Sequence, residues 1–145
     1  MFRAGTVFFD NRRDAGEQLT EELGAYRDQD PVVLGIPRGG VPVAAPVAKS
    51  LKAELDVIVV KKLGAPGNPE LAIGAIGETG DPYLNEDVLE ALSVDEEYLS
   101  EESRTQRQRV EDLASEFRDV QNKIPLENRT VILVDDGIAT GATTR

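Results

Sequence analysis

The sequence contains no cysteine, no histidine and no tryptophan. Without cysteine it can form neither disulfides nor thiolate metal sites. Without histidine it can build neither Ser-His-Asp or Cys-His catalytic arrangements nor imidazole-bound zinc sites. No apolar run approaches the ~20 residues that cross a bilayer, and the first ten residues lack a signal-peptide pattern. We therefore expect a cytoplasmic protein that does not contact membranes.

Basic residues are also scarce, and the formal net charge is −11, from 27 acidic against 16 basic residues. Nucleic-acid binding needs clustered Lys and Arg, so we expect no nucleic-acid partner. No basic residue lies between Lys62 and Arg104, where many acidic residues occur. This pattern favours a solvated helical face. Adaptation to high salt is an alternative, because only five of the basic residues are Lys.

The length of 145 residues, of which 40% are hydrophobic, fits one domain with a single core. No internal repeat, low-complexity tract or linker divides the chain. We expect one domain over residues 1–145, with a helical insertion at about residues 86–121.

The first half of the chain alternates between helical and strand patterns. An amphipathic helix is predicted for residues 12–29, followed by a buried strand at 32–37. A second helix should begin near Pro42, although Pro46 lies a turn further in, where it should kink or delay the helix. The next elements are a buried strand at 56–63, a loop rich in Gly and Pro at 64–70, and a strand at 71–77. The short connection between these last two strands predicts that they run antiparallel.

The second half begins with a short predicted helix at residues 86–92. The capping-box spacing at residues 93–96 then predicts a long helix to about Gln121. The second half of that helix has an apolar stripe, whereas its polar first half is expected to project into solvent or to meet another chain. A fourth strand follows at residues 130–136. This order of elements indicates an α/β fold with a mostly parallel sheet.

The last sixteen residues, TVILVDDGIATGATTR, place two acids and a turn of small residues after an apolar strand. Backbone amides in such a turn, before a helix, form an anion-binding site. Asp135 and Asp136 do not suit a phosphate, because carboxylates accept hydrogen bonds and repel anions. They do suit a vicinal diol, so the motif fits a sugar phosphate. The alternative is an ordinary strand, turn and helix with an acidic N-cap.

The segment VILVDDGIATGAT resembles the PRPP-binding motif of type I phosphoribosyltransferases. By this resemblance, Asp135 and Asp136 would bind the ribose 2′- and 3′-hydroxyls. The loop that follows would bind the 5′-phosphate through backbone amides and threonine hydroxyls. Its substrate-binding residues would be Gly137, Ala139, Thr140, Gly141, Ala142 and Thr143.

Two further segments resemble parts of the same family. The segment IPRGG, at residues 36–40, is similar to the pyrophosphate loop, in which a cis peptide bond precedes a residue that is not proline. Its residues would be Pro37, Arg38, Gly39 and Gly40. Lys61 and Lys62 lie at the end of the second predicted strand, where they could simply mark the point at which the chain reaches solvent. Beside a diphosphate they would neutralise charge, and residues 64–70 would form the lid of the family.

The resemblance implies a three-layer α/β/α fold with strand order 3-2-1-4-5-6, in which strand 3 is antiparallel. The four predicted strands fit the first four places, so the last strands would be absent and the chain would be truncated after the PRPP loop. An unpaired strand edge invites association. We therefore expect a homodimer or a higher oligomer. The chain is most similar to small phosphoribosyltransferase-like proteins that carry LGIPRGGVPVA, KKLGAPGNPELAIGAI and VILVDDGIATGAT together.

The reaction implied is transfer of the 5-phosphoribosyl group from PRPP to a nitrogenous base, with release of pyrophosphate. Arg38, Lys61 and Lys62 would stabilise the leaving charge as catalytic residues. Mg²⁺ would be the cofactor, bound mainly through substrate and water rather than by a protein metal site. The family members that act on hypoxanthine and guanine have an Asp where this chain has Ala139, so a 6-oxopurine acceptor handled by that Asp is not expected.

Two other functions fit parts of the pattern. A module of the same fold could sense PRPP or a nucleotide and regulate a partner without catalysis. A PRPP-synthesising enzyme shares the phosphate loop, but it would need an ATP-binding half for which this chain has no room.

Overall fold

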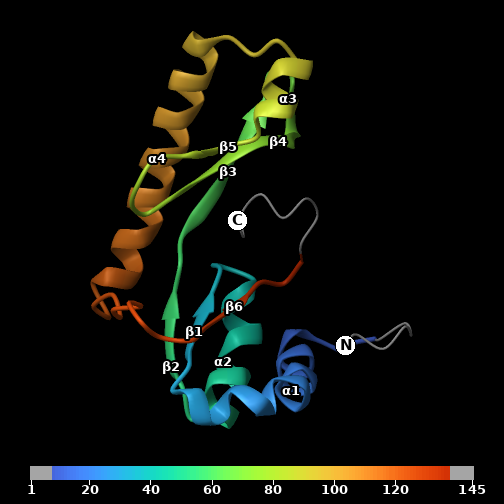
Figure 1. Ribbon diagram of the computed structural model, residues 1–145, viewed down its shortest axis with the longest axis vertical. Coiled ribbons are helices and arrows are strands. Elements are labelled where there is room, and N and C mark those ends of the chain that lie inside the picture. The colour runs from blue at the N-terminus through green and yellow to red at the C-terminus, as the bar shows by residue number, and fades with distance from the viewer. Residues whose placement is uncertain (1–7, 138–145) are drawn as a thin grey trace. The chain divides into compact units, whose positions relative to one another are not determined.

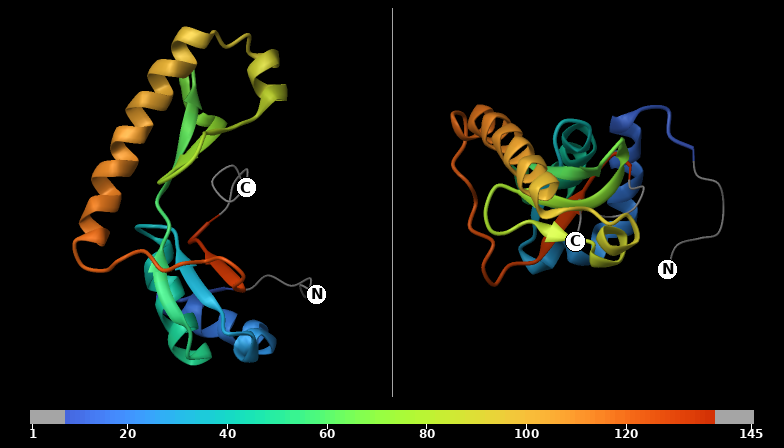
Figure 2. Two further views of the ribbon diagram at one scale, coloured as in Figure 1. Left: turned by 60° about the vertical axis from the view of Figure 1, so that its left-hand side comes forward. Right: turned by 90° about the horizontal axis from the view of Figure 1, so that it is seen from above.

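A computed structural model describes residues 8–137 of the chain, which form two compact units. The first contains residues 8–56 and Pro125–Asp136, and the second contains Val57–Ile124 and Gly137. Figures 1 and 2 show that each unit has its own helices and strands. Within residues 8–137, no helix combines the length and the apolar character that a membrane span requires.

The first unit is built on a three-stranded sheet of order β2-β1-β6. Its strands are β1 (Val32–Gly35), β2 (Glu54–Val57) and β6 (Val131–Val134). The central strand β1 is buried along its whole length, as a β-branched apolar run predicts. β1 and β6 are parallel and paired from Val32↔Val131 to Gly35↔Val134, so both strands end at the same edge of the sheet.

Helices α1 (Arg12–Leu23) and α2 (Gly40–Leu51) complete the first unit, with a 3₁₀ helix, η1, at Gly24–Gln29. α1 begins at Asn11, whose side chain accepts a hydrogen bond of 2.9 Å from the Asp14 amide, a common N-cap arrangement. α2 packs its buried face on β1 and β6, and α1 packs on α2. The buried residues of this core are Val33, Val43, Ala44, Val47, Ala48, Leu51 and Val134.

The helix α2 begins at Gly40 and continues through Pro46, so the predicted delay is wrong, whereas the alternative of a kink stays a prediction. The neighbouring helix packs closely against this proline. A Cβ atom added to Gly16 of α1 would collide with the ring of Pro46 and with the backbone oxygen of Val43. The two helices therefore approach closely at Gly16, and the Pro46 ring fills the contact.

The second unit contains an antiparallel sheet of order β3-β4-β5. Its strands are β3 (Val60–Ala65), β4 (Asn68–Gly77) and β5 (Tyr83–Leu84). β3 and β4 pair antiparallel, which confirms the predicted antiparallel pair. The predicted loop at residues 64–70 is wrong, because only Pro66 and Gly67 lie between the two strands, and Gly67 has a φ of 71°. A register shift around Gly64 lets the strands continue up to this short turn.

Helices α3 (Glu86–Ala91) and α4 (Glu96–Arg118) cover this sheet. The N-cap of α4 is Asp95, which accepts a hydrogen bond of 2.7 Å from the Tyr98 amide. The predicted capping box at Ser93 is therefore wrong, and Ser93 itself has a left-handed φ of 50°. The buried residues of this core, from β3, β4 and α4 and the residue before β3, are Val59, Leu63, Ala65, Ile73, Ile76, Val110 and Leu113.

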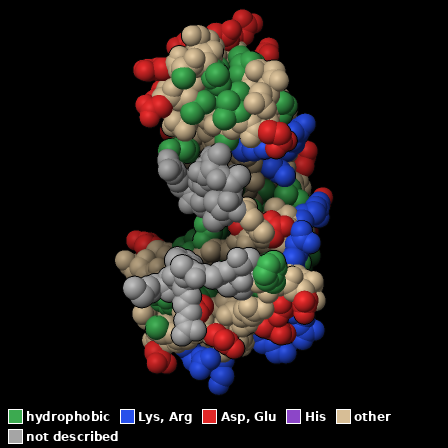
Figure 3. Space-filling view, turned by 90° about the vertical axis from the view of Figure 1, so that its right-hand side faces the viewer, with side chains coloured by type: hydrophobic (Ala, Val, Ile, Leu, Met, Phe, Trp, Pro, Cys, Tyr) green, Lys and Arg blue, Asp and Glu red, His purple; other side chains and the backbone are tan. Residues whose placement is uncertain are grey.

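Part of the first half of α4 packs on its own unit and does not project into solvent as a whole, and whether its exposed face meets another chain stays a prediction. Tyr98 and Leu99 pack against the core, and the Tyr98 hydroxyl donates a hydrogen bond of 2.6 Å to the Gly64 carbonyl. Burial and the nearby Glu102 carboxylate raise the pKa of Tyr98. The acidic residues of α3 and the outer face of α4 are exposed, as the charge pattern predicts. Figure 3 shows acidic side chains at the margin of this unit.

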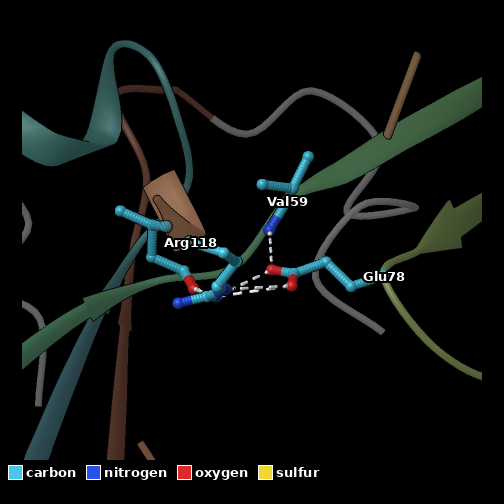
Figure 4. Close-up of polar contacts among 4 residues, drawn as sticks. Val59, Glu78 and Arg118 are labelled. Carbon is cyan, nitrogen blue, oxygen red and sulfur yellow. Dashed lines mark hydrogen bonds and ion pairs between the residues drawn. The ribbon is translucent and has the colours of Figure 1, made fainter. Parts of the chain in front are cut away.

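The single strand predicted at residues 56–63 is two strands, β2 and β3, in separate sheets. Figure 4 shows the contacts at the interruption. Glu78 accepts a hydrogen bond of 3.1 Å from the Val59 amide, and Arg118 donates one of 2.9 Å to the Val57 carbonyl. Arg118 and Glu78 also form an ion pair of 3.0 Å with largely buried side chains. Side chains thus satisfy backbone groups that a continuous strand would pair with a neighbour.

The α/β class and the neighbours of the first predicted strand are confirmed. The predicted sequence of strands is, however, divided over two sheets. The presence of two compact units does not test whether residues 1–145 form one domain with an insertion at residues 86–121, which stays a prediction.

Candidate functional site

The candidate site lies where β1 and β6 end. The Ile36 amide donates a hydrogen bond of 2.9 Å to the Val134 carbonyl, so the parallel pairing continues just past β1. Residues 37–39 then turn into α2, while Asp135 and Asp136 follow β6. The two segments that the sequence singled out therefore leave the sheet from adjacent strands, as ligand sites of open α/β sheets commonly do.

Glycine allows these two segments to approach closely. A Cβ atom on Gly40 would lie 2.6 Å from the Val134 carbonyl oxygen, and one on Gly39 would overlap the carboxylate of Asp136. The peptide bond between Pro37 and Arg38 is cis, as the family resemblance implied. The Gly40 amide donates to the Ile36 carbonyl within this turn. Arg38 is exposed and is the charged residue of this turn. Its guanidinium can donate hydrogen bonds to an anion.

The two aspartates have different surroundings. Asp135 is partly buried, and its Oδ1 accepts a hydrogen bond of 2.9 Å from the Asp136 amide. Burial raises the pKa of Asp135. Asp136 is exposed and accepts hydrogen bonds from the Arg12 guanidinium, which lowers its pKa. The two adjacent carboxylates therefore differ in how readily they take up a proton.

Arg12 is a residue of this site that the sequence analysis did not identify. Its Nη2 lies 2.8 Å from Asp136 Oδ2, and its Nε lies 3.3 Å from the same oxygen. In the sequence, Arg12 is one of two adjacent arginines at the start of a predicted helix. Nothing in that pattern indicates a contact with a residue near the other end of the chain. The contact depends on how α1 packs on α2.

A pocket of about 290 Å³ adjoins the two aspartates in the first unit. Its volume is close to the lower limit of roughly 300 Å³ for small-molecule sites. Apolar side chains of α1 and α2 line the pocket, together with polar side chains at the start of α1 and after β6. The lining residues are Phe9, Asn11, Arg12, Ala15, Leu19, Val43, Asp135 and Asp136.

Lys61 and Lys62 belong to the second unit and lie within β3, not at the end of a strand as predicted. Both side chains are half-buried. Successive side chains of a strand point to opposite faces, so only one of the two lysines can face a given ligand. Lys62 forms an ion pair of 2.9 Å with Glu70 of β4. Arg38 belongs to the first unit and the two lysines belong to the second, so each is described only within its own unit.

Most of the predicted phosphate loop lies outside the described residues. This applies to Ala139, Thr140, Gly141, Ala142 and Thr143, whereas Gly137 is described and exposed. Within residues 8–137, no group of three or more Asp, Glu, His or Cys side chains is placed to hold a metal ion. The carboxylates of Asp135 and Asp136 alone do not form such a group, but they can accept hydrogen bonds from water or sugar hydroxyls.

Residues 6–145 match the family model of the phosphoribosyl transferase domain. The chain belongs to the phosphoribosyl transferase family. Two Mycobacterium tuberculosis proteins, from strains CDC 1551 / Oshkosh and H37Rv, are each 51% identical to it over 137 residues, and each is named "Putative phosphoribosyl transferase". The match covers 94% of this chain and 31% of each relative, so the chain spans about a third of their length.

A solved structure supports the same fold. The crystal structure of TT1426 from Thermus thermophilus has a TM-score of 0.80 to this phosphoribosyl transferase chain and 47% sequence identity. The alignment covers 95% of the chain and 65% of the Thermus protein.

Proposed function

We propose that this chain binds PRPP and transfers its 5-phosphoribosyl group to a nitrogenous base, with release of pyrophosphate. The observation that carries the proposal is the contact between the turn at residues 37–40 and the Asp135–Asp136 pair at the ends of two parallel strands. Membership of the phosphoribosyl transferase family supports it. One segment offers a permanent positive charge and the other offers two carboxylates, which are the groups that a phosphorylated sugar with a free diol requires.

Each group has a separate role in the proposed reaction. Asp135 and Asp136 accept hydrogen bonds from the ribose 2′- and 3′-hydroxyls and so fix the sugar ring. In the reaction the bond from C1 to the pyrophosphate oxygen breaks, the bond from C1 to the acceptor nitrogen forms, and the proton of that nitrogen passes to water. Negative charge grows on the leaving pyrophosphate, and the Arg38 guanidinium stabilises it. One lysine of β3, Lys61 or Lys62, adds to this stabilisation.

Mg²⁺ is the proposed cofactor. The ion meets the two carboxylates only through the sugar hydroxyls or water, and its own ligands come mainly from substrate and water. When bound, the ion neutralises charge on the diphosphate. The phosphate loop formed by Gly137, Ala139, Thr140, Gly141, Ala142 and Thr143 would bind the 5′-phosphate. A homodimer or higher oligomer stays part of the proposal.

The test measures pyrophosphate release from PRPP and Mg²⁺ with a panel of nitrogen acceptors. The wild-type protein should release pyrophosphate with at least one acceptor, and Asp135→Asn with Asp136→Asn should abolish this. Asp28→Asn is the matched control, because Asp28 is an exposed aspartate of the same unit outside the site, and its activity should equal that of the wild type. Tight PRPP binding without release under any acceptor would instead favour a non-catalytic PRPP-sensing module. Absence of PRPP binding would refute both.

A further inference from the structure

Arg12 contacts one oxygen of a proposed substrate-binding carboxylate. Its Nη2 and Nε both donate to Asp136 Oδ2, at 2.8 and 3.3 Å. The contact therefore engages one side of the carboxylate and leaves Oδ1 outside the ion pair. A carboxylate fixed by one oxygen can present the other to a ligand hydroxyl in a defined direction.

The position of Arg12 is fixed by its helix. Arg12 is the first residue of α1, directly after the Asn11 N-cap. Close packing of α1 on α2 at Gly16 then sets the place of the helix. The Asp136 side chain has Gly39 of the neighbouring turn against it and Arg12 donating to it. These contacts come from separate elements and restrict the rotation of the Asp136 side chain.

We propose that Arg12 is a positioning residue of the PRPP site, which anchors Asp136 Oδ2 so that Oδ1 receives a ribose hydroxyl. This inference rests on the proposed function. Arg12 acts through Asp136 and does not touch the reacting atoms. The arrangement differs from a blocking contact, in which Arg12 would compete with the sugar for Asp136, and the two predict opposite effects when Arg12 is removed.

The surrounding charges explain why Asp136 needs a cation. Asp135 contributes an adjacent carboxylate from the end of β6, and Asp10 and Asp14 lie near Arg12 at the start of α1. Positive charge comes from Arg12 and, in the turn before α2, from Arg38. Without Arg12, less positive charge balances the negative charge of these carboxylates. The Asp136 carboxylate then takes up a proton at higher pH, and its side chain loses a fixed orientation.

The experiment measures PRPP affinity by calorimetry from pH 7 down through the carboxylate range, for Arg12→Ala, Arg12→Lys and Arg13→Ala. Arg13 is the matched control, since it is the next residue of the same helix and pairs instead with Glu17. Arg12→Ala should weaken PRPP binding about threefold at neutral pH, as expected for loss of an exposed ion pair. It should also move the acidic loss of binding to higher pH. Arg12→Lys should restore part of both effects, and Arg13→Ala should match the wild type.

A second measurement does not depend on PRPP. Carbon NMR of the Asp136 carboxyl should show a higher pKa in Arg12→Ala than in Arg13→Ala. Equal titration in the two variants would overturn the inference, as would PRPP binding that is unchanged or tighter in Arg12→Ala. Either of these two outcomes would contradict only the positioning role of Arg12, and not the proposed function, if the wild type binds PRPP. A wild type that fails to bind PRPP refutes the proposed function, and the positioning role with it.

Discussion

Gly39 lies directly against the carboxylate of Asp136, and a side chain at Gly39 would occupy the same space as that carboxylate. The backbone of Gly39 has an ordinary helical φ of −66°. The position therefore requires glycine for space and not for conformational freedom. This contact joins the turn after β1 to the acids after β6 and defines the candidate site.

Gly39→Ala should disable the site while leaving the fold intact. The added methyl group displaces the Asp136 carboxylate, and loss of its hydrogen bond to the substrate should weaken PRPP binding by about tenfold or more, since a hydrogen bond to a charged group contributes ~1.5–3 kcal/mol. Calorimetry measures this. Gly24→Ala is the control, because a Cβ there meets nothing within 4 Å. Equal PRPP affinities of the two variants would refute the role of the contact.

Gly16→Ala should destabilise the first unit. The new Cβ collides with the Val43 backbone oxygen and the Pro46 ring, and α1 has to move away from α2. Overpacking typically costs about 1–3 kcal/mol, of which the better helix propensity of Ala offsets at most ~1 kcal/mol. Urea unfolding should show a net loss of roughly 1–2 kcal/mol. Gly24→Ala again serves as control, and an equal midpoint for the two variants would contradict the close helix contact.

Glu78→Gln should destabilise the second unit. The substitution removes the charge that pairs with Arg118, whose side chain is only 21% exposed, and weakens the acceptor for the Val59 amide. We expect a loss of about 2 kcal/mol in the free energy of unfolding, less than for a fully buried pair. Glu111→Gln, at an exposed site in the middle of α4, should be nearly neutral. Comparable unfolding midpoints for the two variants would show that the ion pair contributes nothing.

Asp135→Asn should raise the stability at neutral pH. Burial raises the pKa of Asp135 above its value in the unfolded chain, so the folded state binds the proton more tightly. The stability from this group is fully present below the unfolded pKa and is lost as the pH rises through the folded pKa. At neutral pH the ionised side chain therefore costs stability, and Asn removes that cost.

Asp136→Asn should have the opposite effect, because Arg12 lowers the pKa of Asp136. The stability from Asp136 is present above its unfolded pKa and is lost as the pH falls through the folded pKa. Melting temperatures from pH 7 down to the carboxylate range measure both variants. Asp135→Asn should melt above the wild type and Asp136→Asn below it at pH 7, and both differences should shrink on acidification. Shifts of the same sign at pH 7 would contradict the assigned surroundings.

The elements of the fold were largely predictable from local patterns. The apolar run before Gly35 and the run before Asp135 each form the expected strand, and the two strands pair as parallel neighbours. For β1 the prediction follows from burial, because a strand that is buried on both faces is a continuous apolar run in the sequence. β6 is a similar apolar run, although two of its four residues are exposed. The cis bond before Arg38 was implied by the family resemblance alone.

Several of the features that were missed depend on contacts between residues far apart in the chain. The break between β2 and β3 involves Glu78 and Arg118, whose polar character in the sequence fits exposed positions equally well. The Pro46 ring packs where Gly16 of another helix leaves room for it. Arg12 reaches Asp136 only through the packing of α1 on α2. Periodicity reports the environment of one segment, so it cannot reveal such pairs.

The most direct test of the account is calorimetric titration of PRPP with Mg²⁺ into the wild-type protein and into the double variant Asp135→Asn with Asp136→Asn. The account predicts measurable binding by the wild type and a loss of at least about tenfold in the variant, because two charged acceptors for the ribose diol are removed. Equal affinity of the two proteins, or no binding by the wild type, would contradict it.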